Sequence, residues 1–524
     1  MTEHSDLHQE ITYCEIVLAA LRRFPDRVAF RQDGRDLTYR QTAELLARYA
    51  AVLRRQGLRA GDGVGVLSPN RPEVWLGQTA PVLLGGRFTA LQPLGSLEDH
   101  LYACNEAELR FLLVDPAYAE RAATLLDGSP AVERVLTFGP AEVGEDLSAL
   151  AAAEPPPPPL DAGPHRAEDV AWLLYTGGTT GVPKAAMLPE RAVAQLVYGV
   201  ATGWDLPAER RYLACAPISH AAGMLIVPTL LRGGTVILQR GFDPAAWLRA
   251  VTEERATLSL LVPTMIYALL DHPALDGANL ASLETVMYGA SPMSPARMAE
   301  ALERVGPVFC QLYGQTESGG QGTSLWRADH DRHDLNRLAS CGKPMPSVRV
   351  EILDESGNPV ADGEPGEICL RGPSIMLGYY RQPELTAAAF QHGWLRTGDV
   401  AVRDGEGFLT IVDRKKDMIV SGGFNVFPRE IEDVLTSHPA VSAAAVIGVP
   451  DEKWGEAVKA LVVVKSGAEL DPAELIALVK ERKGPVYAPK SVELVDSLPL
   501  TPVGKADKKL LRARYWKGET RGVH

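Results

Sequence analysis

The chain has 524 residues, more than one hydrophobic core usually organises, so we expect two or more domains. Its hydrophobic content of 46% and charged content of 23% are those of a globular protein. The formal net charge of −13 argues against broad binding to nucleic acid or to an anionic membrane, although it allows a small basic site for a nucleotide.

The cysteines and the apolar stretches predict a protein of the cytoplasm. The six cysteines are scattered and form no Cys-x-x-Cys pair, which favours reduced thiols. Residues 1–10 are polar and contain no signal-peptide core. The longest apolar stretch, 258–270, is interrupted by Ser259 and Pro263 and is too short to span a bilayer.

The first part of the chain alternates between helical and strand patterns. Residues 11–23 and 40–56 have the pattern of helices. Residues 28–30 and 36–39 predict a pair of strands, and residues 63–67 predict a buried strand. Because the alternation continues beyond these elements, we expect layers of α/β structure with a largely parallel sheet.

Five consecutive prolines, 155–159, predict a stiff and exposed segment. Such a segment is either a domain boundary or a surface loop. We favour the loop, because the strand pattern at 170–175 follows soon afterwards and needs the earlier strands beside it.

Helices are next predicted at 244–255, with Asp243 as the N-cap, and at 295–304. Strand patterns at 283–288 and 307–312 run into glycine-containing ends. In open α/β sheets, ligands bind beyond the carboxyl ends of the strands. These two strand ends therefore indicate one shared site.

From residue 348 the pattern changes to a β-rich subdomain, and after residue 419 to a compact α+β segment. The elements expected in these two parts are strands at 348–353, 366–370, 408–412, 441–447 and 460–464, and helices at 429–437 and 472–482. We place the domain boundary in the charged junction 413–417, which gives a large N-terminal domain, 1–415, and a small C-terminal domain, 416–524.

The stretch that carries most of the chemistry is Thr176-Gly177-Gly178-Thr179-Thr180-Gly181-Val182-Pro183-Lys184. Glycines let backbone N–H groups approach a phosphate, threonine hydroxyls add donors, and the lysine adds a mobile positive charge. The spacing is not that of the common P-loop, because Val182 and Pro183 separate the last glycine from Lys184. The pattern predicts a cradle for a polyphosphate, and a flexible surface turn is the alternative.

The whole string resembles the phosphate loop of the adenylate-forming superfamily, which includes acyl-CoA synthetases, amino-acid adenylation domains and luciferases. Ala185-Ala186 departs from the glycine that is usual after the lysine. Further matches run in the family's order from near residue 20 to residue 510. The resemblance implies a large N-terminal domain of layered α/β subdomains with a β-rich subdomain, followed by a small mobile α+β domain.

The resemblance also implies a site for ATP and Mg²⁺. The loop residues 176–181 and Lys184 would bind the phosphates. In the Tyr-Gly-x-Thr-Glu stretch, Tyr313 would pack on adenine, Thr316 would contact the α-phosphate and Glu317 would hold Mg²⁺. The other nucleotide contacts implied are Gly289, Ala290, Ser291, Gly314, Asp399 and Arg414, the last two at the ribose.

The acid pocket implied by the resemblance contains Tyr198, His220, Met224, Gly289 and Met293. We expect His220 to shape and gate this pocket, because a carboxylate substrate is already ionised and needs no base. The stretches 198–202, 220–224 and 289–293 contain no Lys or Arg, which disfavours a second carboxylate on the substrate, and they lack the acidic residue expected for an amino acid. A medium-sized apolar or aromatic carboxylic acid is expected.

In the C-terminal part, Lys505 matches the family's catalytic lysine, Lys416 its hinge, and Gly422-Gly423 the loop beside the tunnel for the thiol. The catalytic set is then Thr176, Lys184, His220, Glu317 and Lys505. The implied reaction converts the acid to an acyl-adenylate with release of pyrophosphate, and then transfers the acyl group to a thiol, for which coenzyme A is expected.

One departure leaves the acceptor open. Relatives often carry a basic residue in a Tyr-Lys-x-Pro stretch near the coenzyme A phosphates, whereas this chain has Tyr487-Ala488-Pro489 and leaves Lys490 and Lys483 for that task. A carrier-protein thiol, or nitrite in an ATP-dependent diazotase, is the alternative acceptor. A non-catalytic nucleotide-binding relative is the second alternative, although all expected catalytic positions are filled.

Overall fold

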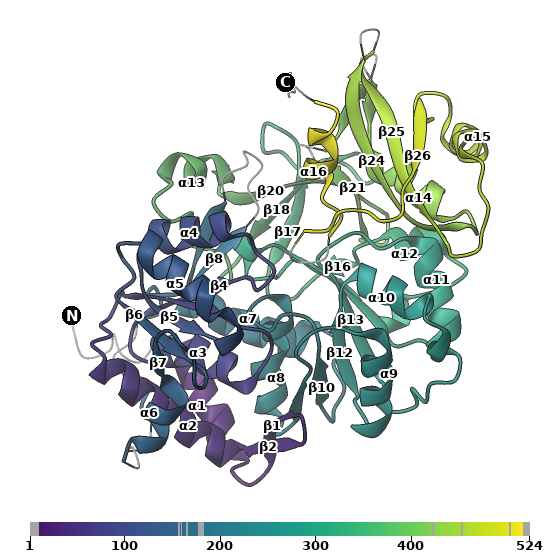
Figure 1. Cartoon of the computed structure of the whole chain (residues 1–524). Coiled ribbons are helices and arrows are strands. Elements are labelled where there is room, and N and C mark those ends of the chain that lie inside the picture. Colours follow the sequence, from purple (N-terminus) through teal and green to yellow (C-terminus); the bar gives the residue numbers. More distant parts are fainter. Residues whose placement is uncertain are drawn as a thin grey trace.

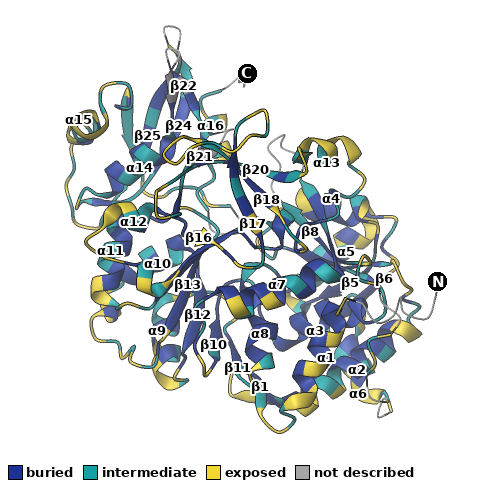
Figure 2. Cartoon of the chain, turned by 180° about the vertical axis from the view of Figure 1, so that it is seen from behind, coloured by how far each residue is buried: buried dark blue, intermediate teal, exposed yellow. Residues whose placement is uncertain are grey.

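A computed structural model describes residues 10–155, 158, 160–163, 166–176, 183–414, 417–421, 424–451, 454–501 and 505–516. The fold is mixed α/β, with two large sheets and a smaller third sheet in the N-terminal part and a fourth sheet in a small C-terminal part (Figure 1). Figure 2 shows that the strands of the large sheets are buried and that the surrounding helices expose their outer faces. In the described part of the chain, no helix combines the length and the apolar character that crossing a membrane requires.

The first large sheet has seven strands in the order β7-β6-β5-β3-β4-β8-β9. Its strands are β3 (Gly63–Leu67), β4 (Arg87–Leu91), β5 (Leu109–Val114), β6 (Arg134–Thr137), β7 (Glu145–Asp146), β8 (Val170–Thr176) and β9 (Lys184–Pro189). All neighbours are parallel except β8 and β9, which form an antiparallel pair. Strands before and after the proline run belong to this one sheet, as the prediction of a loop requires; residues 156, 157 and 159 of the run lie outside the described residues.

The second large sheet has nine strands in the order β16-β15-β14-β13-β12-β10-β11-β1-β2. Its strands are β1 (Val28–Gln32), β2 (Arg35–Thr38), β10 (Arg211–Ala214), β11 (Thr235–Leu238), β12 (Leu258–Leu261), β13 (Thr285–Gly289), β14 (Phe309–Tyr313), β15 (Thr323–Leu325) and β16 (Lys343–Pro344). Strands β13 and β14 are parallel neighbours, as their predicted shared site requires. The antiparallel pair β1 and β2 confirms the predicted N-terminal strand pair.

The α-helices are α1 (Tyr13–Arg23), α2 (Tyr39–Arg55), α3 (Pro72–Val82), α4 (Leu97–Glu106), α5 (Ala119–Gly128), α6 (Leu147–Ala153), α7 (Glu190–Gly203), α8 (Ile226–Leu231), α9 (Pro244–Glu253), α10 (Pro263–Leu270), α11 (Pro295–Arg304), α12 (Leu335–Ala339), α13 (Pro383–Ala389), α14 (Pro428–Thr436), α15 (Pro472–Lys483) and α16 (Lys508–Ala513). The side chain of Asp243 accepts a hydrogen bond from the Ala246 N–H, so the predicted N-cap of α9 is confirmed. Helix α11 has the predicted bounds, because Ser294 caps it and Pro295 starts it.

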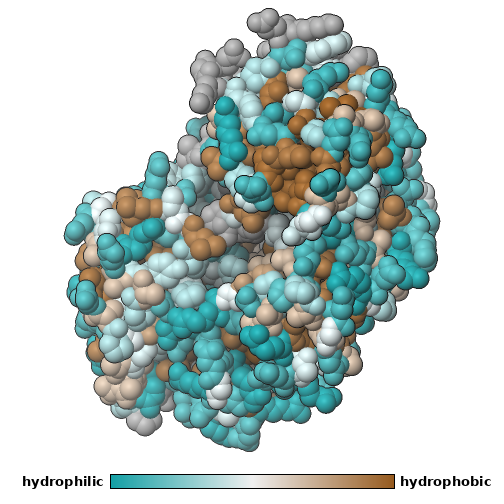
Figure 3. Space-filling view, turned by 45° about the vertical axis from the view of Figure 1, so that its right-hand side comes forward, coloured by the Kyte–Doolittle hydropathy of each residue, from teal (hydrophilic) through white to brown (hydrophobic). Residues whose placement is uncertain are grey.

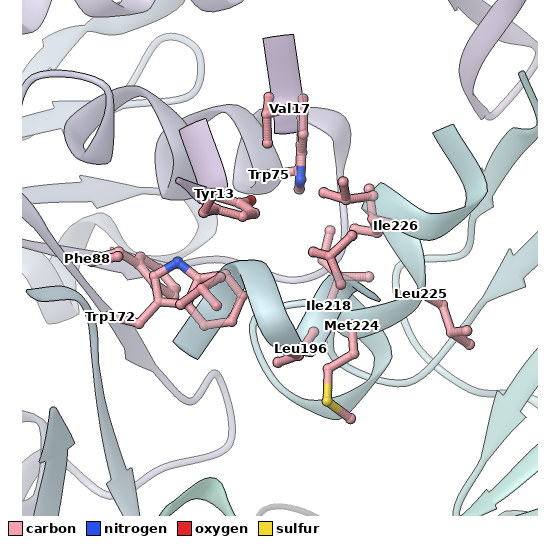
Figure 4. Packing of buried hydrophobic residues seen from close by; sticks show 14 of the residues in the cluster. Tyr13, Val17, Trp75, Phe88, Trp172, Leu196, Ile218, Met224, Leu225 and Ile226 are labelled. Atoms are coloured by element: carbon pink, nitrogen blue, oxygen red, sulfur yellow. The ribbon is translucent and has the colours of Figure 1, made fainter. Parts of the chain in front are cut away.

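A continuous hydrophobic core joins the two large sheets. Tyr13 of α1 meets Trp172 of β8 edge to face, with ring centroids 5.5 Å apart. Figure 4 shows this pair opposite Trp75 of α3, Leu196 of α7 and Ile226 of α8. Because aromatic and branched side chains from both sheets share one core, the two sheets hold a fixed relation to each other.

A buried carboxyl group lies at the edge of this core. Glu190, at the start of α7, is 1% exposed and accepts hydrogen bonds of 3.3 Å from both the N–H and the thiol of Cys14. Burial raises the pKa of Glu190 to about 7. All six cysteines, Cys14 among them, are unpaired and buried, which agrees with the predicted reduced thiols.

We expect Glu190→Gln to remove a pH dependence of stability. The folded pKa lies above the unfolded value, so wild-type stability falls as pH rises from about 5 to 8, by about 1–3 kcal/mol from this group. The variant lacks that loss. Its Tm relative to wild type should therefore be higher at pH 8 than at pH 5, and identical pH profiles of Tm would contradict the prediction.

Two small sheets complete the fold. The third sheet contains β17 (Arg349–Leu353), β18 (Gly366–Arg371), β19 (Phe390–Gln391), β20 (Trp394–Arg403) and β21 (Leu409–Arg414). The C-terminal sheet contains β22 (Ile419–Ser421), β23 (Phe424–Val426), β24 (Val441–Asp451), β25 (Gly455–Val464) and β26 (Ser491–Leu494). The chain thus changes sheet between β21 and β22, around the predicted domain boundary; Lys416 itself lies outside the described residues.

Candidate functional site

A cavity of about 2010 Å³ lies where the carboxyl ends of strands from both large sheets face the small C-terminal part. In the space-filling view the surface is hollowed between the large part and the C-terminal unit (Figure 3). The predicted site residues that line the cavity are Thr176, Lys184, His220, Met224, Ala290, Gly314, Thr316, Glu317 and Lys505. These residues are spread over 330 positions of the sequence, and the fold brings them to one space.

Strands β8 and β9 fix the two ends of the predicted phosphate loop. Thr176, the last residue of β8, pairs with Lys184, the first residue of β9, so the intervening segment leaves and re-enters the sheet at one point. The Thr176 Oγ1 lies 3.5 Å from the Glu317 Oε1. Residues Gly177, Gly178, Thr179, Thr180 and Gly181 lie outside the described residues.

Tyr379 is a residue of this site that the sequence did not reveal. Its hydroxyl donates a 2.9 Å hydrogen bond to the Glu317 Oε1, and the Lys184 Nζ lies 4.8 Å from the centroid of its ring. Burial, and next the Glu317 charge, raise the pKa of Tyr379 well above its usual value, so it remains a donor. The only available signal is the Gly378-Tyr379-Tyr380 stretch, which has no strand or helix pattern. Tyr379 therefore positions Glu317 and contacts Lys184.

We expect Tyr379→Phe to lower the rate of acid-dependent pyrophosphate release about tenfold to hundredfold, since it removes one hydrogen bond to a carboxylate. The ring beneath Lys184 is kept, so the position of the lysine should be retained. The Mg²⁺ concentration that gives half the maximal rate should rise. The matched control is Tyr380→Phe, because the Tyr380 ring contacts Arg87, with the Arg87 Cζ 4.9 Å from the ring centroid. Equal effects of the two variants would contradict the role of Tyr379.

The end of β13 has an unusual backbone. A Cβ on Gly289 would lie 2.2 Å from the Leu312 carbonyl oxygen, so only glycine fits there. The next residue, Ala290, lines the cavity with φ +63°, in the left-handed region that non-glycine residues seldom adopt. This strained turn brings the β13 backbone to the cavity wall, whereas Ser291 is not part of the wall.

The predicted ribose region is built around Asp399. This carboxylate is 3% exposed and accepts hydrogen bonds of 2.8 Å from the Tyr313 hydroxyl and 2.9 Å from the Gln315 amide. In the sheet, Asp399 pairs with Arg414 on β21, as the predicted shared task at the ribose requires, although only the backbone of Arg414 is described. The cavity wall is formed by neighbours of these residues, 314–317 and 396–398. Tyr313 thus holds Asp399 and is not among the residues that line the cavity; its contact with adenine stays a prediction.

His220 lines the cavity as predicted and is neutral at pH 7. Burial lowers the pKa of His220 to about 4, and its Nδ1 lies 2.9 Å from the Ser219 hydroxyl. The wall also contains apolar residues, among them Leu196, Met224 and Leu312. A neutral imidazole in an apolar wall suits the predicted shaping role and not general-base chemistry.

Two predicted acid-pocket residues lie elsewhere. Tyr198 is 38% exposed, because it follows the cavity-lining Leu196 by two positions and so lies on the other face of α7. Met293 is 1% exposed and packs in a separate core with Trp247. Gly289 does not line the cavity, whereas the next residue, Ala290, does. Helix phase and core packing, which the motif spacing does not report, cause these differences.

The C-terminal part supplies the other side of the cavity through Met418, Glu456, Leu500, Thr501, Lys505 and Trp516. Lys505 and Thr501 hold each other: the Thr501 N–H donates to the Lys505 carbonyl at 2.7 Å, and the Lys505 N–H to the Thr501 Oγ1 at 3.1 Å. Lys505 lines the same cavity as Lys184 and Glu317. Gly422 and Gly423 lie outside the described residues.

The two lysines predicted to be available for coenzyme A, Lys483 and Lys490, each contact another side chain. Lys483 forms a 2.7 Å ion pair with Glu430, and the Lys490 Nζ lies 5.6 Å from the Trp454 ring centroid. Among the described residues, no group of three or more His, Cys, Asp or Glu side chains is arranged to hold a metal ion.

The family follows from comparison with known proteins. The AMP-binding enzyme family matches residues 17–380, and the AMP-binding enzyme C-terminal domain matches residues 430–505. The chain belongs to the AMP-binding enzyme family, the adenylate-forming enzymes that its motifs predicted.

Individual relatives resemble the chain over nearly its full length. The medium/long-chain-fatty-acid–CoA ligase FadD8 of Mycobacterium tuberculosis is 48% identical over 523 residues, which cover 97% of this chain and 91% of that protein. Feruloyl-CoA synthase of an Amycolatopsis species is 42% identical over 498 residues, covering 94% and 97%. The structure of the amide bond synthetase McbA from Marinactinospora thermotolerans superimposes with a TM-score of 0.86 at 36% identity, covering 96% of this chain and 99% of that one.

Proposed function

We propose that the protein is an AMP-forming ligase that joins a medium-sized apolar or aromatic carboxylic acid to coenzyme A. The observation that carries this proposal is the single cavity that contains Thr176, Lys184, Glu317 and Lys505 beside an apolar wall at His220. The names of the relatives support the acid and the acceptor, since two of them are a fatty-acid–CoA ligase and feruloyl-CoA synthase.

In the first step a carboxylate oxygen of the acid bonds to the α-phosphorus of ATP while the bond to the β-phosphate breaks, and pyrophosphate leaves. We assign Lys184 and the loop 176–181 to the phosphates, and Lys505 to the charge that develops at the α-phosphate. Glu317, with the Thr176 hydroxyl beside it, offers oxygen ligands to a Mg²⁺ ion that arrives with the nucleotide. The ion would neutralise phosphate charge.

In the second step the thiolate sulfur attacks the acyl carbon, the bond from that carbon to the AMP oxygen breaks, and AMP leaves. We assign the hinge between the two domains, 1–415 and 416–524, to Lys416, and the tunnel for the thiol to Gly422 and Gly423. The unpaired buried thiols favour the reducing cytoplasm as the compartment.

The test is a screen for pyrophosphate release over aliphatic, aryl and cinnamic acids, followed by mass spectrometry of the products with coenzyme A. We expect one subclass of apolar or aromatic acids to give both pyrophosphate and the acyl-CoA thioester. No release with any acid would favour the non-catalytic nucleotide-binding alternative.

A different acceptor is the second candidate. The ion pair between Lys483 and Glu430 occupies one of the two lysines available for coenzyme A, and McbA, an amide bond synthetase, has the same fold. Pyrophosphate release without a CoA thioester would support this candidate. Product analysis with a carrier protein, an amine or nitrite would then identify the acceptor.

A further inference from the structure

A second cavity lies at the amino ends of strands in the nine-stranded sheet, whereas the large cavity lies at the carboxyl ends. Its volume is about 440 Å³, within the range of about 300–1,000 Å³ that is usual for small-molecule pockets. The residues that line it are Arg27, 208–211 and 232–235. They directly precede or begin β1, β10 and β11, which are parallel neighbours, so their amino ends meet near β1 and β2 at the lower edge in Figure 1.

Hydrogen bonds between these strand starts hold the walls together. The Thr235 N–H donates to the Arg210 carbonyl at 2.9 Å, and the Thr235 hydroxyl to the Val28 carbonyl at 2.8 Å. The lining requires glycine at position 234, because a Cβ on Gly234 would lie 2.3 Å from the Arg210 carbonyl oxygen. The cavity is therefore built by the strand register and a glycine turn.

The lining is strongly cationic in a chain whose net charge is −13. The lining contains four arginines, Arg27, Arg210, Arg211 and Arg232, and one carboxylate, Glu209. Arg211 is already paired with Glu254 at 3.4 Å. Among the described residues, Arg210 and Arg232 have no carboxylate within ion-pair distance, so positive charge is left over at this cavity.

Arg210 is a buried cation without a counter-charge. It is 7% exposed, and its Nε and Nη1 donate to the carbonyls of Pro207 at 3.1 Å and Pro228 at 2.5 Å. These two bonds use only part of the five N–H donors of a guanidinium. Burial, and next the Arg232 charge, lower the pKa of Arg210 to about 10. An anion in the cavity would offset the cost of burying this charge.

We propose that the cavity lined by Arg27, Arg210, Arg211 and Arg232 binds a phosphate-bearing anion, either free phosphate or the phosphorylated headgroup of a lipid. Arginine suits this ligand because its planar fork donates two parallel hydrogen bonds to phosphate oxygens. Both sources present the same group to the exposed rim formed by Arg27 and Arg232. The proposal does not depend on the ligase function, because the residues assigned to that function lie at the carboxyl ends of the strands.

The test is calorimetric titration of the protein with inorganic phosphate at low ionic strength. Wild type is compared with the double variant Arg27→Ser/Arg232→Ser, which keeps the buried Arg210. We expect wild type to bind one phosphate that the variant binds at least tenfold more weakly. The matched control, Arg54→Ser/Arg249→Ser, removes the same charge from exposed positions without ion pairs in the described part of the chain, and should bind as wild type does. Unchanged acid-dependent pyrophosphate release shows that each variant is folded.

Co-sedimentation with vesicles identifies the source of the phosphate. The probes are vesicles of phosphatidylglycerol mixed with phosphatidylcholine, and vesicles of phosphatidylcholine alone. Binding to the first kind only, lost in the Arg27/Arg232 variant and kept in the control, assigns the lipid headgroup. Phosphate binding without vesicle binding assigns the free ion. The proposal is overturned if wild type binds neither probe, or if the two double variants bind both probes equally well.

Discussion

Replacing Lys505 by alanine should lower acid-dependent pyrophosphate release about 100-fold to 1,000-fold, because one charge that stabilises the developing negative charge at the α-phosphate is lost. Lys505 lines the cavity together with Lys184 and Glu317 although it belongs to the C-terminal part. The second step should change less than about threefold when synthetic acyl-adenylate and coenzyme A are supplied, because the α-phosphate is then only a leaving group. The measurement is the rate of each half-reaction in separate assays.

The matched control is Lys509→Ala, which removes an exposed lysine four residues further along the chain. It should leave both half-reactions near the wild-type rates. If Lys505→Ala released pyrophosphate at the wild-type rate, the role of this lysine would be wrong. An equal loss in both half-reactions would instead indicate a general defect in the cavity.

Glu317→Gln should reduce kcat/KM for ATP about 100-fold, since it removes a negative charge and keeps the shape of the side chain. The Tyr379 hydroxyl and the Thr176 hydroxyl both face the Glu317 Oε1, at 2.9 Å and 3.5 Å, so the amide should occupy the same place. The readout that distinguishes a metal role from a structural one is the Mg²⁺ dependence. The half-maximal Mg²⁺ concentration should rise, and the Tm should change little.

Glu253→Gln is the control for this change, because Glu253 is exposed and has no ion pair in the described structure. Its kinetics should match those of wild type. A Glu317→Gln enzyme with wild-type Mg²⁺ dependence would contradict the assignment of Glu317 to the metal ion.

The sequence predicted those parts of the fold that local chemistry determines. Helix α11 begins at Pro295 after a Ser294 cap, and β3 is a short apolar run, so both have their predicted bounds. The sequence pattern does not predict strand β20, because residues 394–403 combine polar and apolar side chains without clean alternation. The pairing of β1 with β11 joins segments some 200 residues apart, which no local pattern reports.

In the candidate site, too, the sequence predicts the residues that belong to motifs and does not predict those that depend on tertiary contacts. Thr176, Lys184, Glu317 and Lys505 were predicted because they belong to motifs, and the structure places them around one cavity. Tyr379 belongs to none of these motifs, and its role depends on a contact with Glu317, which lies 62 positions earlier. The resemblance implies that Tyr198 belongs to the acid pocket, but the helix turns its side chain outward.

The central claim is that a carboxylate oxygen of the substrate attacks the α-phosphorus of ATP. Supplying the preferred acid with both carboxylate oxygens labelled as ¹⁸O, and analysing the nucleotide by mass spectrometry after one turnover with coenzyme A, tests it directly. We predict AMP that carries one ¹⁸O atom and pyrophosphate that carries none. Unlabelled AMP, or ADP together with labelled phosphate, would contradict the mechanism.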